Sequence, residues 1–256
     1  MERFNGKVAI VTGASSGIGK AIASQLVEEG MNVAGLARRK EKLEELRDSL
    51  GGLKGVFHPV PVDMSKEADI IQAFDYVAEH LGAIHVLVNS AGCSRITPLS
   101  CGETDNWKDI FDINVIGLSI ATREALKNMA ANQTDGHIVH INSIYGHYAT
   151  KLNNSMYCAS KFAVTALTES LRCELIARKS RTKITSISPG YVETEFMDVL
   201  SKTSNGLFSK ELLHSFRHNN PYLKPEDVAN CVLYALKTPP HVQVHDVIIR
   251  PIGEKI

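Results

Sequence analysis

The sequence predicts an α/β fold in which a doubly wound, mainly seven-stranded parallel sheet carries helices on both faces. Three observations support this prediction. Apolar runs of β type recur along the chain, and stretches long enough for helices separate the first six of them. The runs are continuously apolar, which is typical of parallel strands that are buried on both faces. A glycine-rich turn follows the first run and leads into the first helix.

The elements follow in chain order. Seven strands are expected at residues 8–11, 32–36, 56–62, 84–88, 137–141, 184–187 and 244–249. Helices are expected between them, at residues 17–29, 66–80, 107–132 and 155–179. Gly30 is expected to end the first helix as a C-cap residue. Pro225 is expected to start the last helix, and the Thr238-Pro239-Pro240 sequence to stop it.

The length fits one large α/β domain or two small ones, and since the sequence shows no linker, we expect one domain over residues 1–256. Composition argues against several function classes. Apolar residues make up 44% of the 256, enough for a sizeable buried core. Lys plus Arg equals Asp plus Glu, at 28 each, so no overall field favours nucleic acid. No run approaches the roughly 18 apolar residues that a membrane span needs. We therefore expect no nucleic-acid partner and no integral membrane segment.

The cysteines indicate a reducing compartment. There are five, an odd number, and none forms a C-x-x-C pair, which argues against a disulfide framework and a cysteine-rich metal site. The start, MERFNGKVAIVTG, lacks a long apolar region of signal-peptide type. His137 and His140 form H-x-x-H, but residues three apart on a strand face opposite sides, so we expect no metal site. A cytoplasmic protein is the expectation.

One segment, at residues 198–222, differs from the rest. It is rich in Ser and Asn, weakly periodic, and lies between an expected strand end and the last helix. Loops beyond the carboxyl ends of strands hold the ligand in sheets of this kind. A substrate lid is therefore one interpretation, and a solvated surface loop is the other.

The glycine-rich turn, TGASSGIG, indicates nucleotide binding of the Rossmann type. Gly13, Gly17 and Gly19 lie where a strand turns into a helix, so a pyrophosphate can approach the backbone and the positive helix N-terminus. The spacing is G-x-x-x-G-x-G and not the commoner G-x-G-x-x-G. The candidate contacts in this turn are Gly13, Ser15, Ser16, Gly17, Ile18 and Gly19.

The end of the second strand favours NADP(H) over NAD(H). Enzymes that use NAD tend to carry a carboxylate there for the adenosine ribose hydroxyls, whereas this chain has Ala37 followed by Arg38 and Arg39. A guanidinium would bind a 2′-phosphate that a carboxylate would repel. Alternatively, these arginines only solvate the start of the next helix, where acidic residues stand close enough to pair with them.

A second set of polar residues lies in the carboxyl half of the sheet. Tyr157 and Lys161 stand one helical turn apart, with only small residues between them, and Ser143 ends the strand HIVHINS. Asn114 stands in an expected helix. Taken one at a time, each has an ordinary structural interpretation as a surface pair, a turn residue or a satisfied buried amide.

Together these residues resemble the catalytic tetrad of the short-chain dehydrogenase/reductase family. Further motifs of that family appear in order: TGASSGIG, VDMS, NSAG and SPGYVET. The resemblance covers essentially the whole chain and implies an NADP(H)-dependent oxidoreductase acting on CH–OH groups. It implies that Tyr157 is the acid/base, with Ser143 bonding the same substrate oxygen. Lys161 would hold the nicotinamide ribose, and Asn114 a water that links Lys161 to solvent.

Elementary electrostatics agrees with that assignment. A free tyrosine has a pKa of about 10, too high for a base at neutral pH. An ammonium one turn away, together with the positive nicotinamide ring, is expected to lower the pKa of Tyr157 by about 2–3. The small residues at 158–160 are expected to leave room for the nicotinamide ribose.

The resemblance also implies the remaining cofactor contacts. Asp63 would reach the adenine edge, and the NSAG residues would line the adenosine ribose. The full set of these contacts is Asp63, Met64, Asn89, Ser90, Ala91, Gly92, Pro189, Gly190, Val192 and Thr194, with Tyr157 and Lys161. Two departures stand out: Ser90 replaces the usual second Asn, and Ser16 stands where many NADP enzymes carry a basic residue. One of the two usual phosphate anchors is therefore missing.

Several stretches, among them FAVTALTESLRCEL and LKPEDVA, resemble the farnesol dehydrogenase-like branch, which is related to cytosolic ketosteroid reductases. This resemblance implies an apolar alcohol or carbonyl substrate, with a farnesol-like isoprenoid alcohol favoured. A ketosteroid or general carbonyl reductase is the alternative, and a non-catalytic NADP(H)-sensing or scaffold protein is a remote one. Apolar residues on more than one face of the helices around Asn114 and Tyr157 indicate a homodimer or homotetramer.

Overall fold

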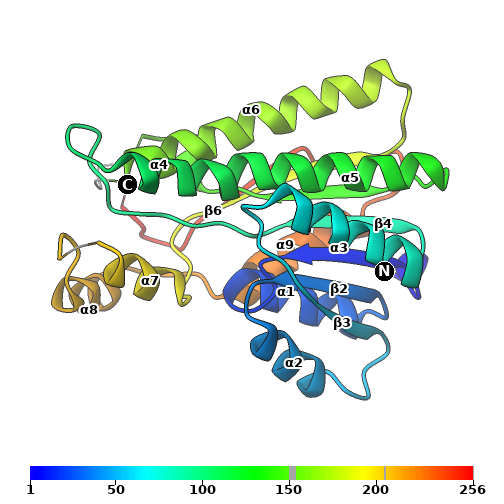
Figure 1. Ribbon diagram of the computed structural model, residues 1–256, viewed down its shortest axis with the longest axis horizontal. Helices are drawn as coiled ribbons and strands as arrows, with labels where there is room; N and C mark the ends of the chain where they lie inside the picture. The colour runs from blue at the N-terminus through cyan, green and yellow to red at the C-terminus, as the bar shows by residue number, and fades with distance from the viewer. Residues whose placement is uncertain (150–153, 205, 256) are drawn as a thin grey trace.

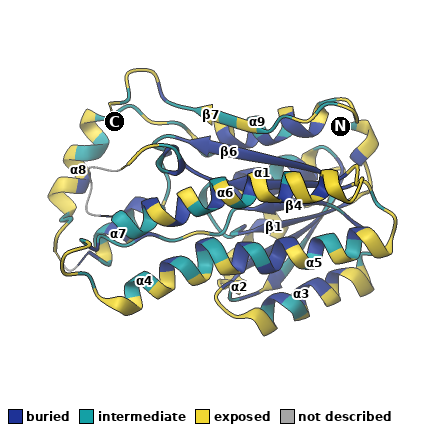
Figure 2. Cartoon of the chain, turned by 90° about the horizontal axis from the view of Figure 1, so that it is seen from above, coloured by how far each residue is buried: buried dark blue, intermediate teal, exposed yellow. Residues whose placement is uncertain are grey.

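The computed structural model describes residues 1–149, 154–204 and 206–255. Its seven strands form one parallel sheet in the order β3-β2-β1-β4-β5-β6-β7, with helices on both faces (Figures 1 and 2). The strands are β1 (Val8–Thr12), β2 (Asn32–Ala37), β3 (Val56–Pro61), β4 (Ile84–Asn89), β5 (His137–Ile141), β6 (Lys183–Pro189) and β7 (Asp246–Ile249). The predicted fold class is confirmed.

The helices alternate with the strands as the apolar runs predict. They are α1 (Gly17–Glu28), α2 (Lys40–Ser49), α3 (Glu67–His80), α4 (Thr104–Phe111), α5 (Leu118–Ala131), α6 (Ser155–Ala177), α7 (Phe196–Lys202), α8 (Lys210–Asn219) and α9 (Pro225–Lys237). Three short helical segments complete them: η1 (Glu2–Phe4), η2 (Asp112–Gly117) and η3 (Ile144–Gly146). Among the described residues, no helix is both long and apolar enough to cross a membrane.

Two apolar layers hold the helices to the sheet. Alternate residues of one strand face opposite layers, as Ala9 and Ile10 of β1 do. One layer joins the sheet to α1, α2 and α9, and the other joins it to α3, α5 and α6. Figure 2 shows the consequence, with the central strands dark and the outward faces of the helices exposed. This packing fixes the carboxyl ends of β1, β4, β5 and β6 along one edge, where the candidate site lies.

The helix expected at residues 107–132 is instead built from three parts. Between α4 and α5, the six residues of η2 form a π-helix. Gly117 ends this segment against the Met64 carbonyl, where a Cβ atom would collide with that oxygen. A π-turn widens the helix locally and is often found at functional sites. This segment carries Asn114, whose side chain is buried.

The segment at residues 198–222 is helical and not a solvated loop, with residue 205 outside the described residues. Helices α7 and α8 bury Met197, Leu200 and Leu213, and aromatic side chains pack around them. Arg217 of α8 donates two hydrogen bonds to the Asp198 carboxylate of α7, at 3.0 and 2.9 Å. The two helices therefore form a small packed unit beside the carboxyl end of β6 (Figure 1).

Candidate active site

The glycine-rich turn brings two segments together at the end of β1. Gly13 and Gly17 have φ angles of 72° and 54°, a region that favours glycine. A Cβ on Gly13 would lie 2.9 Å from the Ala91 backbone, and one on Gly19 would collide with the Gly13 carbonyl. Thr12 Oγ1 accepts hydrogen bonds from the Ser90 and Ala91 amides, both at 3.0 Å. The turn is therefore closely packed and lies directly against the NSAG segment.

Arg39 lies on this turn and not only in solvent. Its Nη2 donates to Ser16 Oγ at 2.7 Å and to Ser15 Oγ at 3.2 Å, and its Nε donates to Ser15 Oγ at 3.3 Å. Its Nη1 forms an ion pair with Glu195 at 3.0 Å. The sequence alternative, in which the arginines pair with the acidic residues of the next helix, does not describe Arg39.

Arg38 is exposed and contributes to the field at Asp63. Partial burial favours the protonated form of Asp63, but hydrogen bonds from the Ser65 amide and hydroxyl, and then the charge of Arg38, outweigh it. The net result is a lowered pKa for Asp63. This carboxylate is therefore held in its ionised form, next to the end of β3.

Asn89, at the end of β4, carries an unpartnered polar atom. Its Nδ2 donates to Thr122 Oγ1 at 3.0 Å, whereas its buried Oδ1 has no hydrogen-bond partner among the described residues. Buried polar atoms normally have partners, so such an acceptor marks a position where a ligand group fits. Met64 is also buried. Ile18 packs against the apolar layer that joins the sheet to α1, α2 and α9.

Lys161 is buried in α6, and its ammonium is aimed at the sheet. Its Nζ donates to the Ile141 carbonyl at 2.9 Å and lies 5.7 Å from the centroid of the Tyr157 ring. Burial lowers the pKa of Lys161 to about 8. The lysine is thus mostly protonated at pH 7, although its side chain is only 6% exposed.

Ser143 joins the end of β5 to Tyr157. Its Oγ accepts a hydrogen bond from the Tyr145 amide at 3.1 Å and shares a hydrogen bond with the Tyr157 hydroxyl. Ser143, from the end of β5, therefore lies beside Tyr157 and Lys161, which α6 carries one helical turn apart. The ring of Phe196, the first residue of α7, lies 5.8 Å from the Tyr157 ring, centroid to centroid.

The expected lowering of the Tyr157 pKa is not found in the chain by itself. Burial raises the pKa of Tyr157 well above its ordinary value, and the hydrogen bond with Ser143 only partly opposes that rise. Loss of hydration disfavours the phenolate more than one hydroxyl contact stabilises it. The distance of 5.7 Å between the Lys161 ammonium and the Tyr157 ring exceeds that of a direct ion contact. The expected lowering joined the Lys161 ammonium with the nicotinamide ring of the oxidised cofactor, so it stays a prediction for the cofactor complex.

Asn114 connects the π-helix to the loop after β4. Its Oδ1 accepts from the Cys93 amide at 2.8 Å, and its Nδ2 donates to the Cys93 carbonyl at 2.9 Å and to Ser160 Oγ at 3.0 Å. The side chain is only 1% exposed, so these contacts satisfy a fully buried amide. Asn114 thereby fixes Cys93 against the helix that carries Tyr157.

The small residues between Tyr157 and Lys161 serve helix packing. Cys158 is buried, with its Sγ 3.3 Å from the Tyr145 carbonyl, and Ser160 is buried in contact with Asn114. Only Ala159 is exposed. The small size of Cys158 and Ser160 lets α6 approach η3 and η2 closely. The expected room for a nicotinamide ribose stays a prediction.

The segment after β6 reaches back to the glycine-rich turn. Pro189 ends the strand, and Val192 forms a parallel bridge with Leu223. Thr194 lies beside Gly17, since a Cβ atom added to Gly17 would lie 3.1 Å from Thr194 Cγ2. The predicted residues from opposite halves of the sheet thus converge on one site.

Sequence reasoning missed two carboxylates that support this segment. Glu254 accepts from the Tyr191 amide at 2.6 Å and from Arg250 Nε at 2.8 Å, and its carboxylate occupies the space that a Cβ on Gly190 would need. Glu195 pairs with Arg39. The Tyr191–Glu254 and Arg39–Glu195 contacts join residues far apart in the chain, and no local motif marks them.

The two histidines of the H-x-x-H motif bind different neighbours. His137 contacts Thr185 of β6 at 2.8 Å. His140 contacts Thr168 of α6 at 3.0 Å and Thr122 of α5 at 3.3 Å. Burial lowers the pKa of each to about 3, so both rings are neutral at pH 7. They act as buried hydrogen-bonding groups in the sheet.

Comparison with known proteins places these features in a family. The family model described as short chain dehydrogenase matches residues 7–205. The chain is 45% identical over 260 residues to a protein of Aedes aegypti named farnesol dehydrogenase, and the match covers 100% of both chains.

Solved structures give the same picture of the fold. "The Closed form of serine dehydrogenase complexed with NADP+" has a TM-score of 0.87 at 28% identity, covering 97% of this chain and 96% of that one. A short chain dehydrogenase/reductase from Burkholderia phymatum in complex with NAD has a TM-score of 0.84 at 26% identity, covering 97% and 90%. The fold is thus shared with proteins solved with either nucleotide.

Proposed function

The chain belongs to the short-chain dehydrogenase/reductase family, and we propose that it is an NADP(H)-dependent oxidoreductase that interconverts an apolar alcohol and its aldehyde or ketone. One observation carries the proposal. The Tyr157 hydroxyl, Ser143 and the buried Lys161 ammonium meet at the carboxyl ends of the strands. The glycine-rich turn lies at the same edge of the sheet, linked to this group through Thr194 and the segment that carries Phe196.

The residues fit a nicotinamide dinucleotide. The turn has no side chains at Gly13, Gly17 and Gly19, and the unpartnered Oδ1 of Asn89 offers an acceptor. When bound, the cofactor supplies or accepts the hydride. The chain's own residues bind and orient it, with Asp63, Met64 and the 89–92 segment on the adenosine side. Pro189, Gly190, Val192 and Thr194 would contact the nicotinamide.

The preference for NADP(H) rests on the end of β2. Ala37 offers no carboxylate to the adenosine ribose, and the Arg39 guanidinium lies against the hydroxyls of Ser15 and Ser16. These two serines stand in for the missing basic residue of the turn, because their hydroxyls can also donate to a phosphate. Arg39 is thus the proposed main anchor of the 2′-phosphate, with exposed Arg38 as the second guanidinium available to it.

Tyr157 is the proposed acid/base. In reduction its hydroxyl gives a proton to the carbonyl oxygen, and in oxidation it takes one from the alcohol. Ser143 Oγ already shares a hydrogen bond with that hydroxyl, so it can bond the same substrate oxygen. The raised pKa of Tyr157 keeps its hydroxyl protonated, as a proton donor must be, but also makes it a weaker acid. To act as a base, the residue needs further positive charge near its oxygen, which the nicotinamide ring of a bound oxidised cofactor and Lys161 would provide together.

The proposed substrate class rests on the apolar side chains that lie beside Tyr157. Phe196 lies against the tyrosine ring and belongs to the apolar cluster of α7 and α8, together with Met197 and Phe208. We propose that these helices are the substrate lid, and that a farnesol-like isoprenoid alcohol is the favoured substrate. The Aedes aegypti relative named farnesol dehydrogenase supports this choice. A cytoplasmic homo-oligomer completes the proposal.

A cofactor-by-substrate assay tests the proposal. Purified protein is mixed with farnesol and either NADP⁺ or NAD⁺, and formation of the reduced cofactor is followed by absorbance. A steroid ketone and a panel of aldehydes with NADPH form the second arm. We expect turnover of farnesol with NADP⁺ to exceed turnover with NAD⁺ at least tenfold. Preference for NAD⁺ would reject the role of Arg39, and cofactor binding without any turnover would favour a sensor.

A further inference from the structure

The Arg39 guanidinium, proposed to bind the 2′-phosphate, already forms an ion pair with a carboxylate of the same chain. Arg39 Nη1 donates to Glu195 Oε2 at 3.0 Å. The Nε atom and both hydrogens of Nη2 are directed to Ser15 and Ser16. Only one N–H of Nη1 is left outside these four contacts, whereas a phosphate prefers two parallel N–H bonds. To form two hydrogen bonds with Arg39, a phosphate therefore has to displace at least one of its present acceptors.

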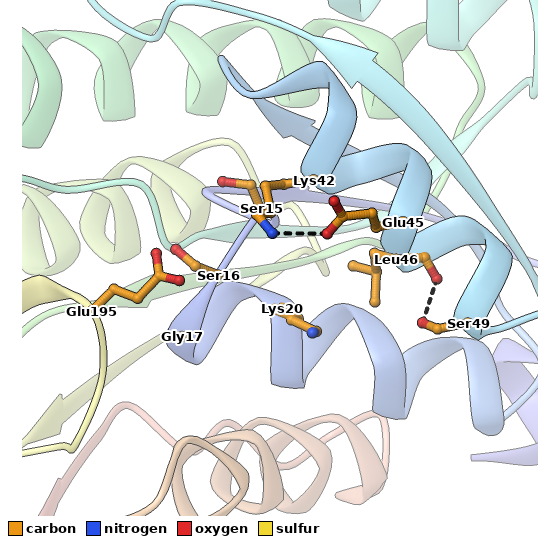
Figure 3. Close-up of a pocket in the computed structure, with 9 residues that line it drawn as sticks. All are labelled: Ser15, Ser16, Gly17, Lys20, Lys42, Glu45, Leu46, Ser49 and Glu195. Atoms are coloured by element: carbon orange, nitrogen blue, oxygen red, sulfur yellow. Dashed lines mark hydrogen bonds and ion pairs between the residues drawn. The ribbon is translucent and has the colours of Figure 1, made fainter.

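Glu195 is the group that a phosphate would displace. The two serine hydroxyls can turn to donate to a phosphate, but a carboxylate offers no proton and carries the same sign of charge. Figure 3 shows the Glu195 carboxylate beside Ser16, at one end of a hollow of about 270 Å³ between α1 and α2. Its charge also acts on Lys42, whose pKa is raised mainly by a hydrogen bond with Glu45 and to a smaller extent by Glu195.

We propose that Glu195 is a specificity-determining residue that competes with the adenosine 2′-phosphate for Arg39 and so limits the preference for NADP(H) over NAD(H). The inference rests on the proposed NADP(H) function. Both partners are about half exposed, at 47% and 57%, so the pair is weak and a dianion can displace it. NAD(H) has an uncharged 2′-hydroxyl at that position and does not compete for the guanidinium.

The test is a set of binding titrations that need no turnover. Dissociation constants for NADPH and NADH are measured by cofactor fluorescence for the wild type, Glu195→Gln, Arg39→Ala and the double variant. Glu195→Gln removes the charge and keeps the shape, so we expect NADPH to bind about three- to tenfold more tightly and NADH to change less than twofold. In the Arg39→Ala background, the same substitution should have no effect on the ratio of the two constants.

Glu193→Gln is the matched control. Glu193 lies two residues away in the same segment, but its carboxylate pairs with Arg217 at 3.3 Å and not with Arg39. Its removal should leave the NADPH-to-NADH ratio unchanged. An equal change in both Gln variants would mean that only the general field matters, and this would overturn the proposal.

Two other results would overturn it. An unchanged ratio in Glu195→Gln would show that the carboxylate does not compete, and weaker NADPH binding would show that it orients Arg39 for the phosphate. The wild-type ratio separates this inference from the proposed function. Tighter binding of NADH than NADPH by the wild type would reject NADP(H) preference itself, whereas the change on substitution still measures the role of Glu195.

Discussion

Lys161 should cost the protein stability, and replacing it with methionine should reveal that cost. Burial lowers the pKa of Lys161 from 10.5 to about 8, while the side chain makes one hydrogen bond, to the Ile141 carbonyl. A pKa difference of this size corresponds to about 3 kcal/mol of preference for the neutral form. At pH 7 the lysine is charged in the folded and the unfolded chain, so the folded chain bears this cost.

Lys161→Met removes the charge and keeps an unbranched chain of similar length. The variant loses one charge-assisted hydrogen bond, worth about 1–2 kcal/mol, so we expect a net stabilisation of about 1–2 kcal/mol. For a chain of this size, Tm should rise by about 3–6 °C. Thermal unfolding by circular dichroism at pH 7, without cofactor, measures the change. Activity should be lost in the same variant.

The pH dependence identifies the cause. The folded-state pKa lies below the unfolded one, so the unfolded chain binds more protons between pH 8 and 10.5, and wild-type stability gains with rising pH there. The advantage of Lys161→Met should therefore shrink above pH 8. Lys54→Met, the same change at an exposed lysine, should show neither effect. A Lys161→Met variant that is less stable than wild type would refute the reasoning, and so would a stabilisation that does not change with pH.

Two further predictions concern the loop after β4. Asn114→Ala leaves the Cys93 amide and carbonyl without their hydrogen-bond partner. The free energy of unfolding, measured in urea, should therefore fall by about 2–4 kcal/mol. A loss below about 1 kcal/mol would contradict the packing role of Asn114. Burial raises the pKa of Cys93 to about 11. At pH 8, iodoacetamide should therefore label the exposed Cys101 and Cys173 before Cys93, which peptide mass spectrometry measures. Labelling of Cys93 at the same rate would contradict this prediction.

The strands were predictable because their apolar runs are continuous, and continuity reflects burial on both faces. The π-helix was not, because it depends on the close approach of Gly117 to the Met64 carbonyl, a contact between distant residues. Helices α7 and α8 were also missed. Their apolar residues face a small cluster and not the main core, and the Arg217–Asp198 pair that joins them leaves no periodic pattern.

The candidate site divides in the same way. Residues with a fixed chemical role, such as Tyr157, Lys161 and Ser143, are recognisable because together they resemble the tetrad of a known family, and the structure brings them together. The rise in the Tyr157 pKa in the chain by itself was not predicted, because it depends on how much water the fold removes from the hydroxyl. The ion pair of Arg39 with Glu195, 156 residues away, likewise exists only in three dimensions.

The most direct test of the account is the turnover of Tyr157→Phe, measured beside its affinity for NADPH. Phenylalanine keeps the ring that packs on Phe196 and removes only the hydroxyl that forms a hydrogen bond with Ser143. We predict that kcat/KM for the best substrate falls about a thousandfold, while the Kd for NADPH stays within about threefold. Turnover that survives within tenfold of wild type would contradict the assignment of Tyr157 as the group that transfers the proton.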